Sequence, residues 1–489
     1  YTRRMVADEL KKQIKKALNV LKLQFGDIAL EHPADERHGD YSTNAALQFK
    51  IQSSTPMGGQ AKFNVAVKNS KLAKTWTPRE IAHQLVKELK NERPEFIDRV
   101  EVAGPGFINF WLSEHFLLEE MKRILDLGEK YGENALGKGK KILLEFTDPN
   151  PFKEFHIGHL YSNVVGESLA RLLEATGATV KRANYQGDVG LHVAKAVWGM
   201  IEKLKIPHFA IASRGRQNEK FKVVKKELDI WERKTLEDRV RFLGECYAMG
   251  ARAYEEDEKT KGKIEEINRG IYANDSDHRE LYEAGRRWSL EYFEIIYKRL
   301  GTKFDFYYFE RDAGRVGLEL VGKHLKKGIF EESKGAVIFP GEKYGLHTRV
   351  FINSQGLPTY EAKDLGLAPT KFEGFAYDES IIITGNEVDE YFRVVLKALS
   401  LVNPKLGKRT KHLSHGMVRL PGGKVSSRTG DVITGEWLLD EAKRRVMLIG
   451  TRGELPTTGP EAKKPMVQPV PAGTVALGYE LHQGLGVKE

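Results

Sequence analysis

The sequence predicts an α/β protein whose larger part is built on a parallel sheet. The apolar run Ile142–Phe146 has the pattern of a buried strand, and from Ile157 to Ala175 the apolar residues fall on one face of a helix. Thr179–Tyr185 follows as a second strand. A strand, a helix and a strand in this order join parallel strands, whose ligand lies at their carboxyl ends. A strand at Ser380–Thr384 and a helix at Val388–Leu401 repeat the pattern and indicate the second half of the same sheet.

The composition is that of a folded, basic protein. Its 489 residues include 78 Lys and Arg against 68 Asp and Glu, a net charge of +10. With 40% hydrophobic residues, wholesale disorder is excluded. The single cysteine, Cys246, excludes an internal disulfide and a Cys-cluster metal site, and we expect no metal site. No run approaches the ~18 apolar residues of a membrane span, so we expect a cytoplasmic protein with no membrane partner and an anionic ligand.

The first 113 residues predict a small α/β domain. Residues 4–24 read as a basic amphipathic helix. A second helix is expected at Thr77–Lys90, where Thr77 is the N-cap and Glu80 completes a capping box. Strand patterns at Arg99–Ala103 and Phe107–Leu112 flank a glycine-rich turn. Ser113 is a plausible N-cap for a connecting helix that runs to about Leu127.

The segment between the two halves of the sheet is highly charged and helical by pattern, for example at Leu228–Leu243 and Glu280–Leu300. We interpret it as a helical insertion in one nucleotide-binding fold. The sheet is expected to resume at Ala336–Phe339 and Thr348–Ile352. Repeated prolines after about residue 450 indicate an irregular tail. The predicted organisation is therefore an N-terminal domain at 1–113, a connecting helix at 114–137, the first half of the sheet domain at 138–200, the insertion at 201–300, the second half at 301–445 and the tail at 446–489.

Two short motifs suggest chemistry on phosphates. His156-Ile-Gly-His159 stands where the first strand meets its helix, and a helix start attracts anions. Gly158 lets a nucleotide approach the backbone, and both histidines can donate to phosphate oxygens. The alternative is a helix entry with two exposed histidines. Far downstream, Lys424-Val-Ser-Ser-Arg428 offers two cations, Lys424 and Arg428, and two hydroxyls, Ser426 and Ser427, to a polyphosphate. Taken alone, it reads better as a solvated basic loop.

Together, the two motifs resemble the signatures of class I aminoacyl-tRNA synthetases. The residues around them are similar to those of the arginyl-tRNA synthetase family: Glu145-Phe-Thr-Asp-Pro-Asn150, Asn184-Tyr-Gln-Gly-Asp-Val-Gly190 and Leu357-Pro-Thr-Tyr-Glu-Ala-Lys-Asp364. Upstream, Gly39–Asn44 and Ala103–Asn109 resemble the family's N-terminal tRNA-binding domain. The resemblance spans roughly residues 5–445. It implies a Rossmann-type catalytic domain with a helical insertion and a small N-terminal α/β domain.

The resemblance also assigns candidate residues for arginine. Tyr360 and Asp364, four apart on a probable helix, face the same way, and the family uses these positions to hold the substrate, with Asp364 on the guanidinium. Glu145 and Asn150 are directed toward the substrate by the same resemblance. Glu387 stands where relatives commonly carry glutamine, which leaves the details of that contact open. Without the neighbouring motifs, Asp364 would be interpreted as an exposed carboxylate on a helix and Tyr360 as a packed aromatic side chain.

On the ATP side, the resemblance assigns His156, Gly158, His159 and Lys424, with Gly416, Met417 and Val418 as the segment that cradles adenine. Arg428 replaces the second lysine of the commonest class I loop. Family members with such a loop often carry a lysine just before the histidine motif, and Lys153 is at that position. Both cations would stabilise the charge that develops as pyrophosphate leaves. Mg²⁺ is expected with ATP and needs no dedicated protein site.

The implied activity is ATP-dependent activation of L-arginine and its transfer to tRNA(Arg), by a monomer. The family normally continues from Trp437–Ala442 into an anticodon-binding domain, which we expect to be truncated or absent from this chain. Three alternatives stay open: another nucleotidyltransferase with the histidine motif, another class I synthetase such as the cysteinyl enzyme, and a synthetase-derived tRNA-binding protein without catalysis. The cysteinyl enzyme is disfavoured because one cysteine cannot supply a Cys-rich zinc pocket.

Overall fold

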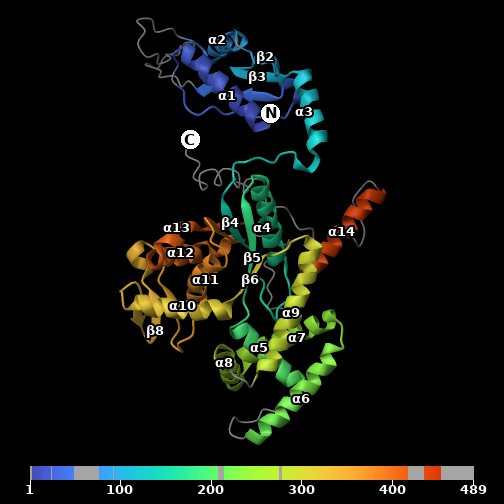
Figure 1. Cartoon of the computed structure of the whole chain (residues 1–489), viewed down its shortest axis with the longest axis vertical. Coiled ribbons are helices and arrows are strands. Elements are labelled where there is room, and N and C mark those ends of the chain that lie inside the picture. The colour runs from blue at the N-terminus through green and yellow to red at the C-terminus, as the bar shows by residue number, and fades with distance from the viewer. Residues whose placement is uncertain are drawn as a thin grey trace, which may run out of the picture. The chain divides into compact units, whose positions relative to one another are not determined.

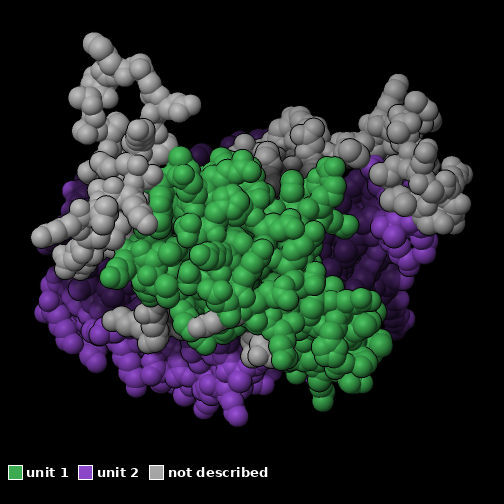
Figure 2. All heavy atoms as spheres, turned by 90° about the horizontal axis from the view of Figure 1, so that it is seen from above, with its two compact units in different colours: residues 1–133 green, residues 134–489 purple. Residues whose placement is uncertain are grey.

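The computed structural model describes residues 3–23, 25–48, 76–91, 93–206, 214–274, 278–416 and 434–452. The chain divides into two compact units, residues 1–133 and residues 134–489, which have separate colours in Figure 2. No helix in the described part of the chain combines the length and apolar character of a membrane span. Helix α14, Gly435–Arg452, continues past the predicted start of the irregular tail at residue 446, and residues 453–489 lie outside the described part.

The first unit packs helices on a small antiparallel sheet. Its strands lie in the order β1, β3, β2, and the apolar sides of α1 and α2 form one core with them. The predicted capping box is confirmed, because the Thr77 backbone N–H donates to Glu80 over 2.6 Å and the Glu80 N–H donates to the Thr77 hydroxyl over 3.2 Å. Ser113 caps the connecting helix as expected. The elements are α1 (Arg3–Val20), β1 (Tyr41–Thr43), α2 (Pro78–Asn91), β2 (Ile97–Ala103), β3 (Phe107–Leu112) and α3 (Glu114–Leu127).

In the second unit, five strands of the described chain form one parallel sheet in the order β11, β10, β4, β5, β6. Figure 1 labels β4, β5 and β6 of this sheet. The α/β fold with a parallel sheet is thus confirmed. From β4 the chain first moves outward through β5 to β6, and later returns to β10 and β11 on the other side of β4. The order therefore reverses between β4 and β10. The strands are β4 (Lys141–Glu145), β5 (Thr179–Gln186), β6 (Phe306–Phe309), β10 (Glu379–Gly385) and β11 (Thr410–His415).

One sequence expectation about the sheet is wrong. The segments at Ala336–Phe339 and Thr348–Ile352 do not extend the parallel sheet. They form β8 (Ala336–Phe339) and β9 (Arg349–Ile352), which join β7 (Glu331–Ser333) in a separate antiparallel sheet. Short apolar runs indicate a strand but not its partner, because pairing depends on contacts between distant segments.

The two faces of the parallel sheet carry different helices. Ile142 and Leu144 on β4 pack with α4 and α9. Leu143, between them, packs on the other face with α11 and α12. Because side chains alternate along a strand, Glu145 projects to the same face as Leu143. The helices are α4 (Ile157–Ala175), α9 (Arg279–Leu300), α10 (Glu310–Leu325), α11 (Tyr360–Gly374), α12 (Asp389–Val402) and α13 (Pro404–Arg409).

Glycines set the close approach of α10 and α11. A methyl group added at Gly317 would lie 1.9 Å from the Ala362 carbonyl oxygen, and one added at Gly366 would lie 2.1 Å from that of Ala313. The two helix backbones therefore touch where both lack side chains. This contact fixes the position of α11, which carries Asp364.

The insertion forms its own helical core. The helix expected at Leu228–Leu243 is in fact interrupted, because Thr235 caps a new helix and its hydroxyl accepts from the Asp238 N–H over 3.1 Å. The apolar pattern continues across this position, but the N-cap at Thr235 starts a separate helix there. The expected helix at Glu280–Leu300 is confirmed as α9. The other helices of this core are α5 (Leu191–Lys203), α6 (Arg214–Glu232), α7 (Leu236–Glu256) and α8 (Glu258–Tyr272).

Candidate active site

The candidate site lies at the carboxyl ends of the parallel strands, where their order reverses. Glu145 ends β4 and Gly385 ends β10, the two neighbouring strands on either side of the reversal. The His156-Ile-Gly-His159 motif begins α4 after the loop that follows β4. Ligands of open parallel sheets bind in this crevice because helix N-termini and strand ends meet there.

The loop from β4 to α4 has an unusual backbone held by specific contacts. Thr147, Asp148 and Phe152 have φ values of 80°, 42° and 66°, a region that costs free energy for residues with a side chain. The Thr147 N–H donates to Ser162 over 3.1 Å, and its hydroxyl accepts from Asn163 over 2.9 Å. Side chains of α4 therefore hold the loop that leads to the histidine motif.

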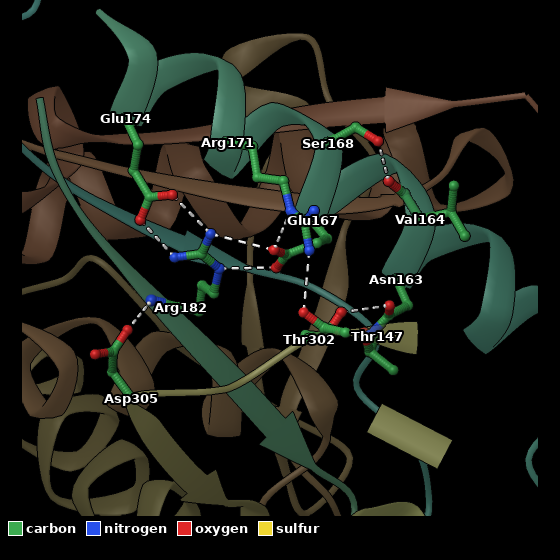
Figure 3. A network of polar contacts seen from close by, with 11 residues as sticks. Thr147, Asn163, Val164, Glu167, Ser168, Arg171, Glu174, Arg182, Thr302 and Asp305 are labelled. Atoms are coloured by element: carbon green, nitrogen blue, oxygen red, sulfur yellow. Dashed lines mark hydrogen bonds and ion pairs between the residues drawn. The ribbon is translucent and has the colours of Figure 1, made fainter. Parts of the chain in front are cut away.

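Figure 3 shows how this contact continues into the sheet. Thr302 donates to Asn163 over 2.9 Å. Farther along α4, Arg182 of β5 donates to Glu167 and Glu174 over 2.8 and 2.7 Å. These bonds tie α4 to β5 and to the segment before β6, so the helix that starts at the histidine motif is fixed along its length.

The two histidines are locked by hydrogen bonds to backbone N–H groups. His156 Nδ1 accepts from the Gly158 N–H over 3.1 Å, and His159 Nδ1 accepts from the His156 N–H over 3.3 Å. In each ring the proton must therefore sit on Nε2, which is left to donate. The rings stack with their centroids 3.7 Å apart. His156 is half-buried and His159 is buried, so the alternative of two exposed histidines fails.

Both imidazoles are neutral near pH 7. Burial, followed by the charge of Lys153, lowers the pKa of His156 to about 4. Burial and the neighbouring His156 hold the pKa of His159 well below its usual range. Two neutral N–H donors thus face a site at a helix start, an arrangement that suits phosphate oxygens.

The chain returns to the histidine motif after residues 417–433. Thr434 pairs with His156 as an antiparallel bridge, and the Gly435 N–H donates to the Phe155 carbonyl over 2.7 Å. Gly416, at the end of β11, has open space where a side chain would stand. The predicted residues Met417, Val418, Lys424, Ser426, Ser427 and Arg428 lie outside the described residues.

Around the end of β4, buried carboxylates from this strand, α10 and α11 gather beside fewer ammonium groups. Lys371 pairs with Glu145 over 2.7 Å, and Lys363 pairs with Glu310 over 2.6 Å. All four side chains are at most 7% exposed. Glu145, expected to face the substrate, therefore already has a buried cation.

Asp364 and Asp148, in the same cluster, accept hydrogen bonds from uncharged donors. Asp364 accepts from the Tyr391 hydroxyl over 2.6 Å, and Asp148 accepts from the Tyr185 backbone N–H over 2.8 Å. Burial raises the pKa of Asp364 to about 8, and the charges of Glu145 and Glu310 act in the same direction. Burial and Glu145 also hold the pKa of Asp148 well above its usual range. A cation placed here would relieve this unfavourable charge.

The remaining predicted residues surround this cluster in different ways. Tyr360 starts α11, is 56% exposed and lies under the Lys363 ammonium, 4.9 Å from its ring centre. Asn150 fits against Gly187, since a methyl group there would lie 2.3 Å from Asn150 Oδ1. Glu387 is exposed and folds back over Gly385, so the described contacts do not bring it to the cluster.

The charge of Lys153 acts both on the histidines and on Glu310 of the acidic cluster. Its ammonium is 5.0 Å from the ring centre of Tyr247 on α7, and its charge lowers the pKa values of His156 and His159. The cation predicted to act on the phosphates is therefore close enough to influence both histidines.

Comparisons with known proteins match this architecture. A family described as "tRNA synthetases class I (R), catalytic domain" matches residues 120–205 and 215–472, well over half the chain. A second, "Arginyl tRNA synthetase N terminal domain", matches residues 8–57 and 48–112.

The chain belongs to the arginyl-tRNA synthetase family.

Individual relatives of the family agree. An arginine–tRNA ligase of Treponema pallidum is 27% identical over 74% of this chain and 58% of its own length, and one of Borreliella afzelii is 29% identical over 73% and 58%. The arginyl-tRNA synthetase structure from Thermus thermophilus superimposes with a TM-score of 0.60 at 21% identity, over 93% of this chain and 72% of its own. The structure from Plasmodium falciparum also gives a TM-score of 0.60, at 17% identity, over 91% of this chain and 69% of its own. Both superpositions show the fold. The chain spans less than two thirds of the length of these curated ligases.

Several residues of this arginyl-tRNA synthetase family site were missed by sequence reasoning. The side chains that line the acidic cluster include Lys371, Glu310, Lys363, Tyr391 and Tyr185. Tyr185 and Lys363 stand within family-like segments but were given no role, and the other three stand in no pattern that signals chemistry. Lys363 was within a family-like segment, but its pairing with a residue 53 positions away leaves no local trace.

Proposed function

We propose that this chain activates L-arginine with ATP and transfers the arginyl group to tRNA(Arg). The observation that carries the proposal is the buried cluster around Asp364, which has more carboxylates than ammonium groups and includes the end of β4, the strand whose loop leads to two neutral histidines at a helix start. The cluster suits a planar cation, and the histidines at the helix start suit a polyphosphate. L-arginine and ATP supply these two groups.

In the first step, a carboxylate oxygen of arginine attacks the α-phosphorus of ATP. A bond forms between this oxygen and phosphorus, the bond from phosphorus to the bridging oxygen breaks, and pyrophosphate leaves with the electron pair. The Nε2–H groups of His156 and His159 donate to phosphate oxygens as negative charge develops. Lys153 supplies a cation to the same charge, together with Lys424 and Arg428. No protein nucleophile takes part, and catalysis rests on positioning.

On the substrate side, Asp364 receives the guanidinium group, and Tyr360 and Asn150 border it. Glu145 acts through Lys371, which it holds beside the pocket. Mg²⁺ arrives with the ATP phosphates, and no group of three or more metal-binding side chains lies among the described residues.

In the second step, a hydroxyl of the terminal ribose of tRNA loses its proton and attacks the arginyl carbonyl carbon. The bond from this carbon to the phosphate oxygen of the adenylate breaks, and AMP leaves with the electron pair. The exposed lysines Lys12, Lys15 and Lys16 of α1 lie opposite its buried face and offer cations to the tRNA backbone. We further propose that bound tRNA supports the first step and that the protein acts as a monomer.

The test is exchange of pyrophosphate into ATP by the full chain, measured with each amino acid, with and without tRNA(Arg). We expect exchange that depends on L-arginine and increases with tRNA. Exchange with another amino acid would identify a different synthetase. Exchange without any amino acid would favour another nucleotidyltransferase, and tRNA binding without exchange would favour the non-catalytic alternative.

A further inference from the structure

The Asp364 carboxylate is held by a tyrosine from another helix. The Tyr391 hydroxyl, on α12, donates to Asp364 Oδ2 on α11 over 2.6 Å. When Asp364 is ionised, this is a short hydrogen bond to a charged acceptor, the stronger class of such bonds. It is also the side-chain hydrogen bond that favours the ionised form of Asp364 against burial.

The ring of Tyr391 is itself fixed in place. The guanidinium carbon of Arg349, on β9, lies 5.2 Å from the ring centre, and Arg349 donates to Glu361 over 3.1 Å. Glu361 stands one helical turn before Asp364 on α11. These contacts link Asp364 on α11, Tyr391 on α12, Arg349 on β9 and Glu361 on α11. They hold the Tyr391 ring so that its hydroxyl points toward Asp364.

We propose that Tyr391 is a positioning residue for the amino-acid substrate: its hydroxyl, oriented by Arg349, holds the Asp364 carboxylate ready for the guanidinium group of arginine. The inference rests on the proposed function. A second observation points to a ligand at this place. Tyr185 is 8% exposed, and its hydroxyl has no hydrogen-bond partner within the described chain. The charges that most influence it include Asp364 and Glu310, so it faces the same cluster.

The charges around Asp364 explain why the hydroxyl matters. Without Tyr391, a carboxylate at this place meets desolvation and like charges, and a protonated carboxyl binds a cation weakly. The groups that face Asp364 are Glu145 from β4, Tyr185 from β5, Glu310 from α10, Tyr360 and Lys371 from α11, Tyr391 from α12 and Asp148 from the loop after β4. Only Lys371 among them is a cation, and it is paired with Glu145.

The experiment compares Tyr391→Phe with wild type in arginine-dependent pyrophosphate exchange with tRNA(Arg), between pH 6.5 and 9. We expect the KM for L-arginine to rise about tenfold or more at pH 7, with kcat and the KM for ATP little changed. The arginine affinity of wild type should improve as the pH rises through about 8, and in the variant this improvement should move to higher pH. Calorimetric titration with L-arginine measures the same loss without turnover.

Tyr292→Phe is the matched control, because its hydroxyl also donates to a carboxylate over 2.6 Å, that of Glu436, outside the acidic cluster. Its KM for arginine should stay at the wild-type value. In an Asp364→Asn background, Tyr391→Phe should cause no further loss of arginine binding. The inference is overturned if Tyr391→Phe binds arginine like wild type at every pH, or if it weakens the binding of ATP and of arginine equally. It is also overturned if Tyr391→Phe weakens arginine binding as much in the Asp364→Asn background as in wild type. If the wild-type protein shows no arginine-dependent pyrophosphate exchange, the result instead contradicts the proposed function.

Discussion

Lys371 Nζ lies 2.7 Å from Glu145 Oε2, in a contact that joins α11 to the end of β4. Both side chains are at most 4% exposed. The pair changes the role expected for Glu145, since its charge is already matched inside the protein. The carboxylate proposed to receive the guanidinium group is Asp364, which accepts from a neutral hydroxyl. A carboxylate in an internal ion pair and one proposed to bind substrate thus act on each other.

Removing one partner of this pair should destabilise the fold. Glu145→Gln leaves the Lys371 ammonium buried without its counter-charge, and we expect the free energy of unfolding to fall by about 3–5 kcal/mol in urea denaturation. Glu387→Gln makes the same chemical change at an exposed residue and should alter stability by less than about 0.5 kcal/mol. Equal stabilities for the two variants would show that the buried pair is not needed.

Lys153 should matter for adenylate formation. Lys153→Ala removes a cation beside His156 and His159, and we expect arginine-dependent pyrophosphate exchange to slow by at least about tenfold, because less charge opposes the leaving pyrophosphate. Lys195→Ala is the control, since that ammonium also lies over a ring of the insertion, 4.1 Å from the centre of Tyr254. Undiminished exchange in Lys153→Ala would remove its assigned role.

Acid should destabilise the protein partly through His192. Burial lowers the pKa of this histidine to about 3, below the value of about 6.5 in an unfolded chain. Between these values the unfolded state binds one more proton, so the free energy of unfolding decreases as pH falls, by about 1.4 kcal/mol per unit. His192→Gln should show a shallower decrease between pH 6 and 4.5 in urea denaturation. Above pH 7.5 the two curves should be parallel, and parallel curves throughout would contradict the assignment.

The contact of α10 with α11 should not tolerate a methyl group. Gly366→Ala places its methyl 2.1 Å from the Ala313 carbonyl oxygen, and we expect a loss of about 3 kcal/mol or more in unfolding free energy. Gly322→Ala, on the same pair of helices, meets nothing within 4 Å and should be neutral or stabilising by about 0.5–1 kcal/mol. Equal thermal stability of the two variants would refute the close approach.

Much of the fold was predictable because its signals are local. The helix at Ile157–Ala175 has the expected bounds, since its apolar face and the glycine that follows lie in one segment. The antiparallel pairing of β8 and β9 was not predictable, because a short strand does not indicate its partner. Neither β6 nor β11 was predicted. Both are short, and their side chains do not alternate in polarity.

The candidate site also contains residues with local sequence signals and residues without them. The histidine motif and the spacing of Tyr360 and Asp364 are local and could be found from the sequence. The partners of the acidic cluster could not, because Lys371 bonds a residue 226 positions away and Tyr391 bonds one 27 positions away. Only the packing of α11 against β4 and α12 brings these groups together, and no short segment carries that information.

Calorimetric titration of wild type and Asp364→Asn with L-arginine tests the central claim most directly. The substitution keeps the size of the side chain and removes its charge. We expect wild type to bind L-arginine but not L-citrulline, which lacks the cation, and Asp364→Asn to bind arginine far more weakly while ATP binding is kept. An arginine affinity in Asp364→Asn equal to that of wild type would contradict the assignment of the acidic cluster as the guanidinium site.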